Sequence, residues 1–222
     1  MLKGKRGIIF GVANDHSIAW GISKKLFEHG AELALTYQND ALLKRIKPLS
    51  EEINSELLIE CDFSQPNSIK KCFDNLNKEW NNIDFVVHAA AFSNKNELNG
   101  RYIDTSLSNF INTLNISCYS FTEITRLASS MMNNGGSLLT LSFYGANKVM
   151  PNYNVMGVAK AALEMSVKYL SVDLGSNNIR VNAISAGPMR TISGAAISKA
   201  REVYKYTEKN SPLHRNVLLE EL

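Results

Sequence analysis

The sequence predicts an α/β fold in three layers: a doubly wound parallel sheet of the Rossmann type with helices on both faces. Strand-length apolar runs alternate with helical periodicity along the whole chain. Runs such as Phe85-Val86-Val87 are apolar at successive positions, which is typical of strands buried on both faces. No repeat or shift in composition marks a boundary, so we expect residues 1–222 to form a single domain.

The apolar runs predict strands at 7–12, 32–37, 57–61, 83–89, 137–142 and 179–184. Between them, apolar residues at helical spacing predict helices that begin near Ile18, Ile69, Phe110 and Met156. After the second strand we expect Asp40 to cap a helix over 41–47 that ends before Pro48. Six such alternations with right-handed crossovers produce the doubly wound sheet.

Composition excludes several classes of protein. The 222 residues are 45% hydrophobic and 20% charged, with a net charge of +3, too near balance to indicate nucleic acid as the main partner. Three cysteines without a C-x-x-C pair and four scattered histidines predict neither a disulfide framework nor a metal site. No apolar run approaches the length of a membrane span, so we expect no membrane partner and a cytoplasmic location.

The loop after the first strand can bind an anion. It lacks G-x-G-x-x-G, but Gly11 allows a tight turn, Ser17 can cap the next helix, and Ala19 and Gly21 allow close backbone approach. Free N–H groups at that helix start suit a pyrophosphate. An ordinary strand–turn–helix junction explains the same residues equally well.

The ends of the second and third strands carry candidates for a nucleoside. Gln38 is neutral and can bond a ribose hydroxyl without attracting a phosphate, which favours NADH over NADPH. Asp62 can accept from an adenine amino group, and Phe63 offers backbone groups beside it. The alternatives are a solvated turn residue for Gln38 and a loop cap for Asp62.

Tyr153 and Lys160 carry a sharper signal. Seven residues at about 100° each place both side chains on one helix face, about two turns apart. A buried tyrosine can donate a hydrogen bond to a developing oxyanion, while a lysine ammonium can hold sugar hydroxyls and lower the pKa of the phenol. Such a pair also arises by chance on a helix face.

The last predicted strand leads into Gly187-Pro188, which reverses the chain. The next residues, 189–196, are rich in small side chains, and we expect this segment to fold over a ligand.

Together these motifs resemble one family. Tyr153-Asn154-Val155-Met156-Gly157-Val158-Ala159-Lys160, the Ser185-Ala186-Gly187-Pro188 turn, the 11–21 loop and Tyr37-Gln38-Asn39-Asp40 are similar to the NADH-dependent enoyl-[acyl-carrier-protein] reductases of bacterial type II fatty-acid synthesis. That family is a divergent branch of the short-chain dehydrogenase/reductases in which Tyr-x-x-x-Lys is lengthened to Tyr-x₆-Lys. The resemblance runs from about Lys5 to the last residues.

The resemblance implies roles for individual residues. Tyr153 would bond the thioester carbonyl and stabilise the enolate, Lys160 would bind the nicotinamide ribose, and Ser93 would contact the substrate. It further implies acyl carrier protein as partner, a homotetramer, and one dinucleotide-binding short-chain reductase domain. The residues implied to line NADH are Gly11, Ser17, Ile18, Gln38, Asp62, Phe63, Ala90, Lys160, Met189, Arg190, Thr191, Ile192 and Ser193.

Three departures from the family pattern stand out. The family usually has a second tyrosine where this sequence has Phe143, and Tyr144, one residue later, points elsewhere in a strand-like segment. Ala89-Ala90-Ala91 stands where Ser-Ile-Ala or Ser-Ile-Gly is common. The family also continues past Leu222 with a seventh strand, which we expect to be missing here.

Three hypotheses follow. The first is an enzyme that reduces a trans-2-enoyl thioester with NADH. The second is a catalytically impaired, NAD-binding relative or fragment, which Phe143 and the short C-terminus favour and the Tyr153–Lys160 pair opposes. The third, a reductase of some other carbonyl, is disfavoured by the seven-residue Tyr–Lys step.

Overall fold

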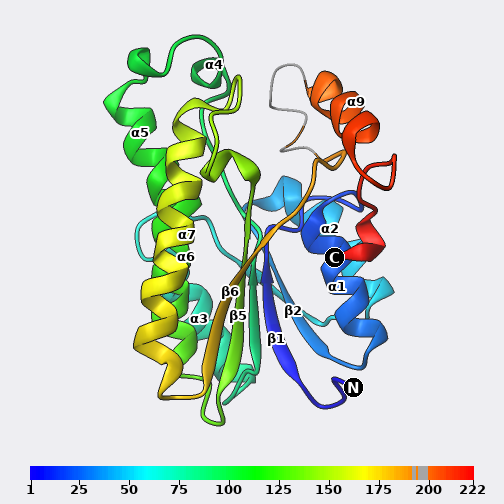
Figure 1. Cartoon of the computed structure of the whole chain (residues 1–222). Helices are drawn as coiled ribbons and strands as arrows, with labels where there is room; N and C mark the ends of the chain where they lie inside the picture. The colour runs from blue at the N-terminus through cyan, green and yellow to red at the C-terminus, as the bar shows by residue number, and fades with distance from the viewer. Residues whose placement is uncertain (192–193, 195–199) are drawn as a thin grey trace.

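The computed structural model describes residues 1–191, 194 and 200–222, and in these residues six strands form one parallel sheet in the order β3-β2-β1-β4-β5-β6 (Figure 1). The order reverses between β1 and β4, so the crevice beyond their carboxyl ends is the expected ligand site. The predicted fold class is confirmed. The strands are β1 (Arg6–Phe10), β2 (Glu32–Tyr37), β3 (Leu57–Glu60), β4 (Phe85–His88), β5 (Gly136–Ser142) and β6 (Ile179–Ser185).

Helices cover both faces of the sheet (Figure 1). Ile9 of β1 packs with α1 (Ile18–Glu28) and α2 (Asp40–Glu52) on one face. Ile8 and Phe10 point the other way, toward α3 (Ser68–Glu79), α6 (Ser120–Ser129) and α7 (Asn154–Gly175). This alternation along one strand produces two apolar cores, one on each side of the sheet.

The remaining elements lie mostly around the carboxyl edge of the sheet. A π-helical turn, η2 (Asn115–Tyr119), joins α5 (Leu107–Leu114) to α6 without a break. The others are α4 (Lys95–Leu98), η1 (Tyr102–Asp104), η3 (Tyr144–Ala146), α9 (Ala200–Asn210) and η4 (Leu219–Glu221).

The prediction for the second helix was wrong at both ends. Asn39, not Asp40, is the cap, because its Oδ1 accepts from the Leu42 N–H at 3.1 Å. The helix then continues through Pro48, which cannot donate to a preceding carbonyl. Burial of Ile46 and Leu49 in the core offsets that local cost, since each fully buried aliphatic side chain contributes about 1.5–3 kcal/mol.

Gly11 ends β1 and brings two strand ends together. Its φ of +102° turns the chain out of the sheet two residues earlier than the apolar pattern predicts. A Cβ at this position would overlap the backbone carbonyl of Ala89, the residue that follows β4. The loop after β1 can therefore touch the loop after β4 only when residue 11 is glycine.

We expect Gly11→Ala to destabilise the fold by roughly 2–4 kcal/mol, because a left-handed φ and a backbone overlap act together. Gly4→Ala is the matched control: Gly4 also has a positive φ, +76°, but no atom lies within 4 Å of its would-be Cβ. That substitution should cost only about 1–2 kcal/mol. Urea unfolding of both variants measures the difference, and equal losses would contradict a tight Gly11–Ala89 contact.

Candidate active site

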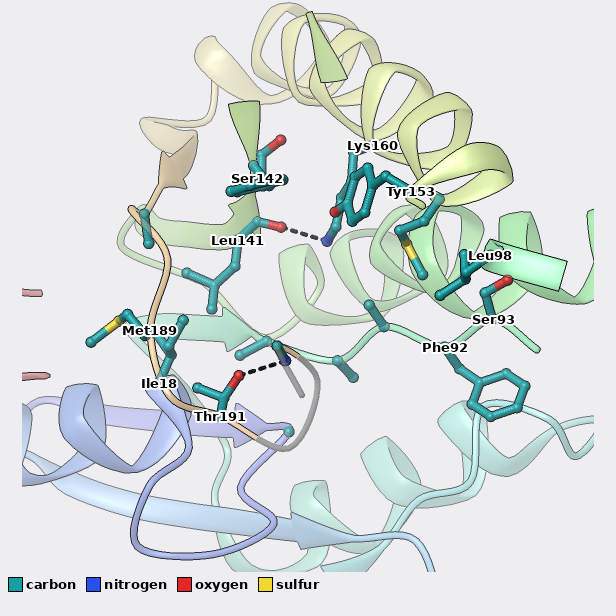
Figure 2. Close-up of a pocket in the computed structure, with 18 of the residues that line it drawn as sticks. Ile18, Phe92, Ser93, Leu98, Leu141, Ser142, Tyr153, Lys160, Met189 and Thr191 are labelled. Atoms are coloured by element: carbon teal, nitrogen blue, oxygen red, sulfur yellow. Dashed lines mark hydrogen bonds between the residues drawn. The ribbon is translucent and has the colours of Figure 1, made fainter. Parts of the chain in front are cut away.

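A cavity of about 900 Å³ opens beyond the carboxyl ends of the strands (Figure 2). Its walls come from the loops after β1 and β4, the end of β5, the start of α7, the segment after β6, and α9. Nine of the thirteen predicted site residues that the structure describes lie in this lining: Gly11, Ser17, Ile18, Ala90, Ser93, Tyr153, Lys160, Met189 and Thr191.

Ser17 occupies the N-cap position of α1, as predicted, but its side chain makes no capping hydrogen bond. The backbone N–H groups of Ala13 and Asn14 instead donate to Ser17 Oγ at 3.0 and 3.1 Å, which folds the loop back on itself. Among the residues that the structure describes, no side chain makes a capping hydrogen bond at the start of α1. Its N-terminal amides therefore stay available to an anionic ligand such as a pyrophosphate.

Lys160 is a buried cation in the wall of the cavity. Its side chain comes from α7, the residue is 7% exposed, and Nζ donates to the Leu141 carbonyl at 2.7 Å (Figure 2). Burial lowers the pKa of Lys160 to about 8, so the ammonium form prevails at neutral pH. An ammonium has three N–H donors, so two more can reach the hydroxyls of a ligand.

Tyr153 lies immediately before α7, beside Lys160 in the cavity wall (Figure 2). Its ring meets Phe143 edge-on at 5.2 Å, and Gly145 packs so closely that a Cβ there would come within 2.5 Å of Tyr153 Cδ1. Burial raises the pKa of the Tyr153 phenol. The expectation that Lys160 lowers this pKa was wrong, because loss of solvent dominates, and Tyr153 remains a protonated hydrogen-bond donor.

The backbone on either side of Tyr153 is unusual. Asn152 and Asn154 have φ values of +59° and +33°. Asparagine is among the few residues that accept this region, so the flanking pair sets a sharp turn that directs Tyr153 inward. Asn154 Nδ2 also donates to the Glu97 carbonyl at 3.2 Å, which ties the turn to α4.

Phe143 and Tyr144 differ in position, as expected from strand alternation. Phe143 lines the cavity, whereas Tyr144 is 55% exposed and lies outside its lining. Phe143 therefore supplies an apolar contact to Tyr153, and Tyr144 does not replace a second active-site hydroxyl.

Ser93 lines the cavity and is fixed by its neighbours. Thr113 Oγ1 donates to Ser93 Oγ at 2.9 Å, and Asn109, which is buried, contacts the same oxygen at 3.3 Å. Asn109 also accepts from the Asn94 N–H at 2.9 Å. The network holds the loop after β4 against α5.

The predicted nucleoside residues lie outside this lining. Gln38 Nε2 donates to Asp62 Oδ1 at 3.1 Å, and the same oxygen accepts from the Ser64 N–H and hydroxyl. Asp62 thus acts as a loop cap. Phe63 stacks on His88 at 5.7 Å, with its ring toward the core. Gln38 follows β2, and Asp62 and Phe63 lie just after β3, so all three lie at the same edge of the sheet as the cavity.

The segment after β6 is described only in part. Met189 and Thr191 line the cavity, and Thr191 Oγ1 accepts from the Gly194 N–H at 2.9 Å (Figure 2). Arg190 lies outside the lining, with its guanidinium 5.7 Å from the Tyr204 ring centre. Ile192 and Ser193 lie outside the described residues.

His88 and Glu164 were missed by sequence reasoning. His88 is 1% exposed, with its two ring nitrogens 2.9 Å from Thr140 Oγ1 and from Ser120 Oγ. Glu164 accepts from Ser142 Oγ at 2.6 Å. Its position one turn after Lys160 was the available signal, whereas the partners of His88 come from β5 and α6 and could not be read from local sequence.

Three features of the cavity fit a dinucleotide: the uncapped start of α1, the Gly11 turn against Ala89, and the buried Lys160 ammonium, which has two N–H donors left for a ligand. Across residues 1–191, 194 and 200–222, no cluster of three metal-binding side chains occurs. Over that same part of the chain, no helix has the length and apolar character to cross a membrane.

Comparisons with known proteins agree with this geometry. Residues 11–222 match the family model described as enoyl-(acyl carrier protein) reductase. The chain is 57% identical over its full length to enoyl-[acyl-carrier-protein] reductase [NADH] 2 of Rhizobium meliloti, of which it covers 83%.

Two solved structures share the fold. The enoyl-(acyl-carrier-protein) reductase of Anaplasma phagocytophilum, in complex with NAD, has a TM-score of 0.95 and 56% identity, with 99% of this chain and 84% of that chain covered. The Bacillus cereus enoyl-acyl carrier protein reductase, with NADP+ and indole naphthyridinone, has a TM-score of 0.96 and 42% identity, with 99% and 86% covered.

The burial of His88 predicts a pH dependence of stability. Burial, and secondly the charge of Lys160, lower the pKa of His88 from 6.5 to about 3. Between these values the unfolded chain binds a proton that the folded chain does not, so the free energy of unfolding should fall as pH drops below about 6.5.

We expect His88→Gln to flatten this dependence, because glutamine does not titrate. Urea unfolding at pH 7 and pH 5 measures it, with His16→Gln, at an exposed position, as the control that should keep the wild-type slope. The same slope in His88→Gln as in the wild type would show that other groups cause the loss.

Proposed function

The chain belongs to the enoyl-(acyl carrier protein) reductase family, and we propose that the cavity between α7 and the β4 loop is its active site. The enzyme reduces the trans-2 double bond of an enoyl thioester in fatty-acid synthesis, with NADH as the hydride donor. The observation that carries the site assignment is the burial of Tyr153 and Lys160 side by side in one cavity wall.

Bound NADH supplies the hydride that adds to the β-carbon of the substrate. As it adds, negative charge develops on the thioester oxygen, and a donor aimed at that oxygen lowers the barrier. Tyr153 is such a donor: burial raises the pKa of its phenol, so the hydroxyl stays protonated at neutral pH. Protonation of the α-carbon then completes the saturated thioester.

Lys160 has a different task in the proposal. Its ammonium is fixed by the Leu141 carbonyl at 2.7 Å and has further donors for the ribose hydroxyls beside the nicotinamide. Gly11, Ser17 and Ile18 would surround the pyrophosphate at the start of α1, with Ala90 beside them. Met189, Arg190, Thr191, Ile192 and Ser193 would close over the cofactor.

The order of the strands in the sheet also indicates which residues would contact the adenosine and which the substrate. Gln38, Asp62 and Phe63 would meet the adenosine end, since β2 and β3 end on the side of β1 away from Tyr153. Ser93 would contact the substrate from the loop after β4. The carrier of that substrate is acyl carrier protein.

The comparisons support the reductase over the alternative of a catalytically impaired relative. The relative with 57% identity over all 222 residues is named enoyl-[acyl-carrier-protein] reductase [NADH] 2. In this chain, both Tyr153 and Lys160 line the cavity. Phe143 removes one hydroxyl from the site but packs on Tyr153 and keeps its ring in place.

Domain organisation, assembly and location complete the proposal. Residues 1–222 are one dinucleotide-binding short-chain reductase domain that works as a homotetramer in the cytoplasm. Exposed apolar side chains on the outer faces of α5 and α7 support self-association, because soluble monomers rarely leave such a surface to water. They are Leu107, Ile111, Met165, Tyr169 and Val172.

Substitution of each member of the catalytic pair tests the proposal. Tyr153→Phe keeps the ring contacts but removes the donor, so kcat for an enoyl thioester should fall by roughly 10²-fold or more while NADH affinity changes little. Lys160→Met should weaken NADH binding as well. Steady-state kinetics with crotonyl thioester and a fluorescence titration with NADH provide both numbers, and unchanged turnover in Tyr153→Phe would refute the assignment.

The choice between NADH and NADPH can be tested at Gln38. Gln38 brings no positive charge to a 2′-phosphate, so NADH should exceed NADPH in kcat/KM by at least about tenfold, on the order of 1.4 kcal/mol. Gln38→Arg should narrow the gap, but only in part, because the new guanidinium also lies beside the Asp62 carboxylate. Gln38→Leu is the matched control without a charge. Equal kcat/KM with both cofactors in the wild type would show that Lys44 or Arg45 reaches the phosphate.

A further inference from the structure

Glu164 holds one short segment of the chain at both of its ends. Its carboxylate lies on α7, one turn beyond Lys160. Oε1 accepts from Ser142 Oγ at 2.6 Å, and Oε2 accepts from Asn147 Nδ2 at 3.0 Å. The two bonds bracket the segment 142–147, which contains η3.

The bracketed segment is what holds the Tyr153 ring. Phe143 meets that ring edge-on at 5.2 Å, and Gly145 packs against it with no room for a Cβ. The position of this segment relative to α7 therefore sets where the Tyr153 hydroxyl points. Glu164 is on the same helix as Lys160, and Tyr153 immediately precedes that helix, so Glu164 fixes the segment relative to both residues.

Glu164 also lies one helical turn from the buried cation. Lys160 Nζ bonds the carbonyl of Leu141, and the hydroxyl of Ser142, the next residue, bonds Glu164. Desolvation lowers the pKa of Lys160, and Cys118 and then Glu164 act in the opposite direction. Burial raises the pKa of the Cys118 thiol, so at neutral pH Glu164 is the member of this pair that carries a negative charge. The titratable groups around Lys160 are Glu164 of α7, Tyr153 immediately before α7, Cys118 of η2 and His88 of β4.

We propose that Glu164 is a positioning residue for the reaction: its carboxylate fixes the segment that orients Tyr153, and it does so one turn from the Lys160 ammonium. The inference rests on the proposed function, since it assigns the support of Tyr153 and Lys160 in that same site. Glu164 itself does not line the cavity and touches neither cofactor nor substrate.

Glu164→Gln tests the hydrogen bonds to segment 142–147 and the charge near Lys160 separately from a general loss of stability. The amide oxygen can still accept from Ser142, but the charge and the acceptor for Asn147 are lost. We expect kcat to fall on the order of tenfold with a smaller change in KM for crotonyl thioester. NADH affinity of the wild type should weaken as pH rises through about 8, where Lys160 loses its proton. In the variant this loss should begin at lower pH, with affinity at pH 8 at least about threefold below the wild type.

Two further variants keep the test decisive. Asn147→Ala removes one bond and leaves the charge, so kcat should fall while the pH dependence of NADH binding stays that of the wild type. Asp173→Asn removes an acid near the other end of α7, on its exposed surface, and is the matched control that should change neither quantity. If Glu164→Gln does not fold, as judged by urea unfolding, Asn147→Ala alone decides whether the bracket matters.

The outcomes distinguish this inference from the proposed function. A wild-type chain that neither binds NADH nor reduces crotonyl thioester overturns the function itself. A wild type that does both, with kcat and the pH dependence of NADH binding unchanged in Glu164→Gln, overturns the role of Glu164. A loss of unfolding free energy alone, without those kinetic changes, also overturns it, because a merely structural residue would behave in that way.

Discussion

The parallel direction of all six strands is the constraint on which the site depends. Each crossover helix returns the chain to the same starting edge, so every loop that follows a strand emerges at the opposite edge. Residues as distant in sequence as Gly11, Ala90 and Lys160 meet there without any long-range pairing of their own. Gly11 makes the meeting close, because only a residue without a Cβ can lie against the Ala89 carbonyl.

Burial acts on the two central side chains in different ways. It raises the pKa of Tyr153 and so keeps a neutral donor, and it lowers the pKa of Lys160 to about 8, close to the point where the cation would be lost. The cation must therefore be held by local groups, and the Leu141 carbonyl and the Glu164 carboxylate are placed to do so. The energetics of the site depend on this balance between desolvation and nearby polar groups.

Much of the fold could be predicted from sequence, because strand runs and helix faces are periodic and local. The helix through Pro48 could not, because burial of its apolar face outweighs the local cost of proline. At the site, Tyr153 and Ser17 line the cavity, but the direction of the Tyr153 pKa shift and the role of the Ser17 hydroxyl differ from expectation, since they depend on solvent access and on how a loop folds back. His88 and Glu164 have partners on other elements, so only the folded chain reveals them.

The number of residues in the π-helical turn η2 sets the rotation of α6 relative to α5. Its extra residue per turn rotates α6 by about 100° relative to a continuous α-helix. Ser117, inside the turn, exchanges hydrogen bonds with the Phe92 backbone at 3.0 and 3.1 Å, and Asn115 donates to the Phe63 carbonyl at 3.2 Å. Deleting one residue there would restore ordinary helical bonding yet turn Phe121 and its neighbours away from the sheet. Length variation in this family should therefore be tolerated in the surface loops and excluded from this helix, even though the change would make the helix itself more regular.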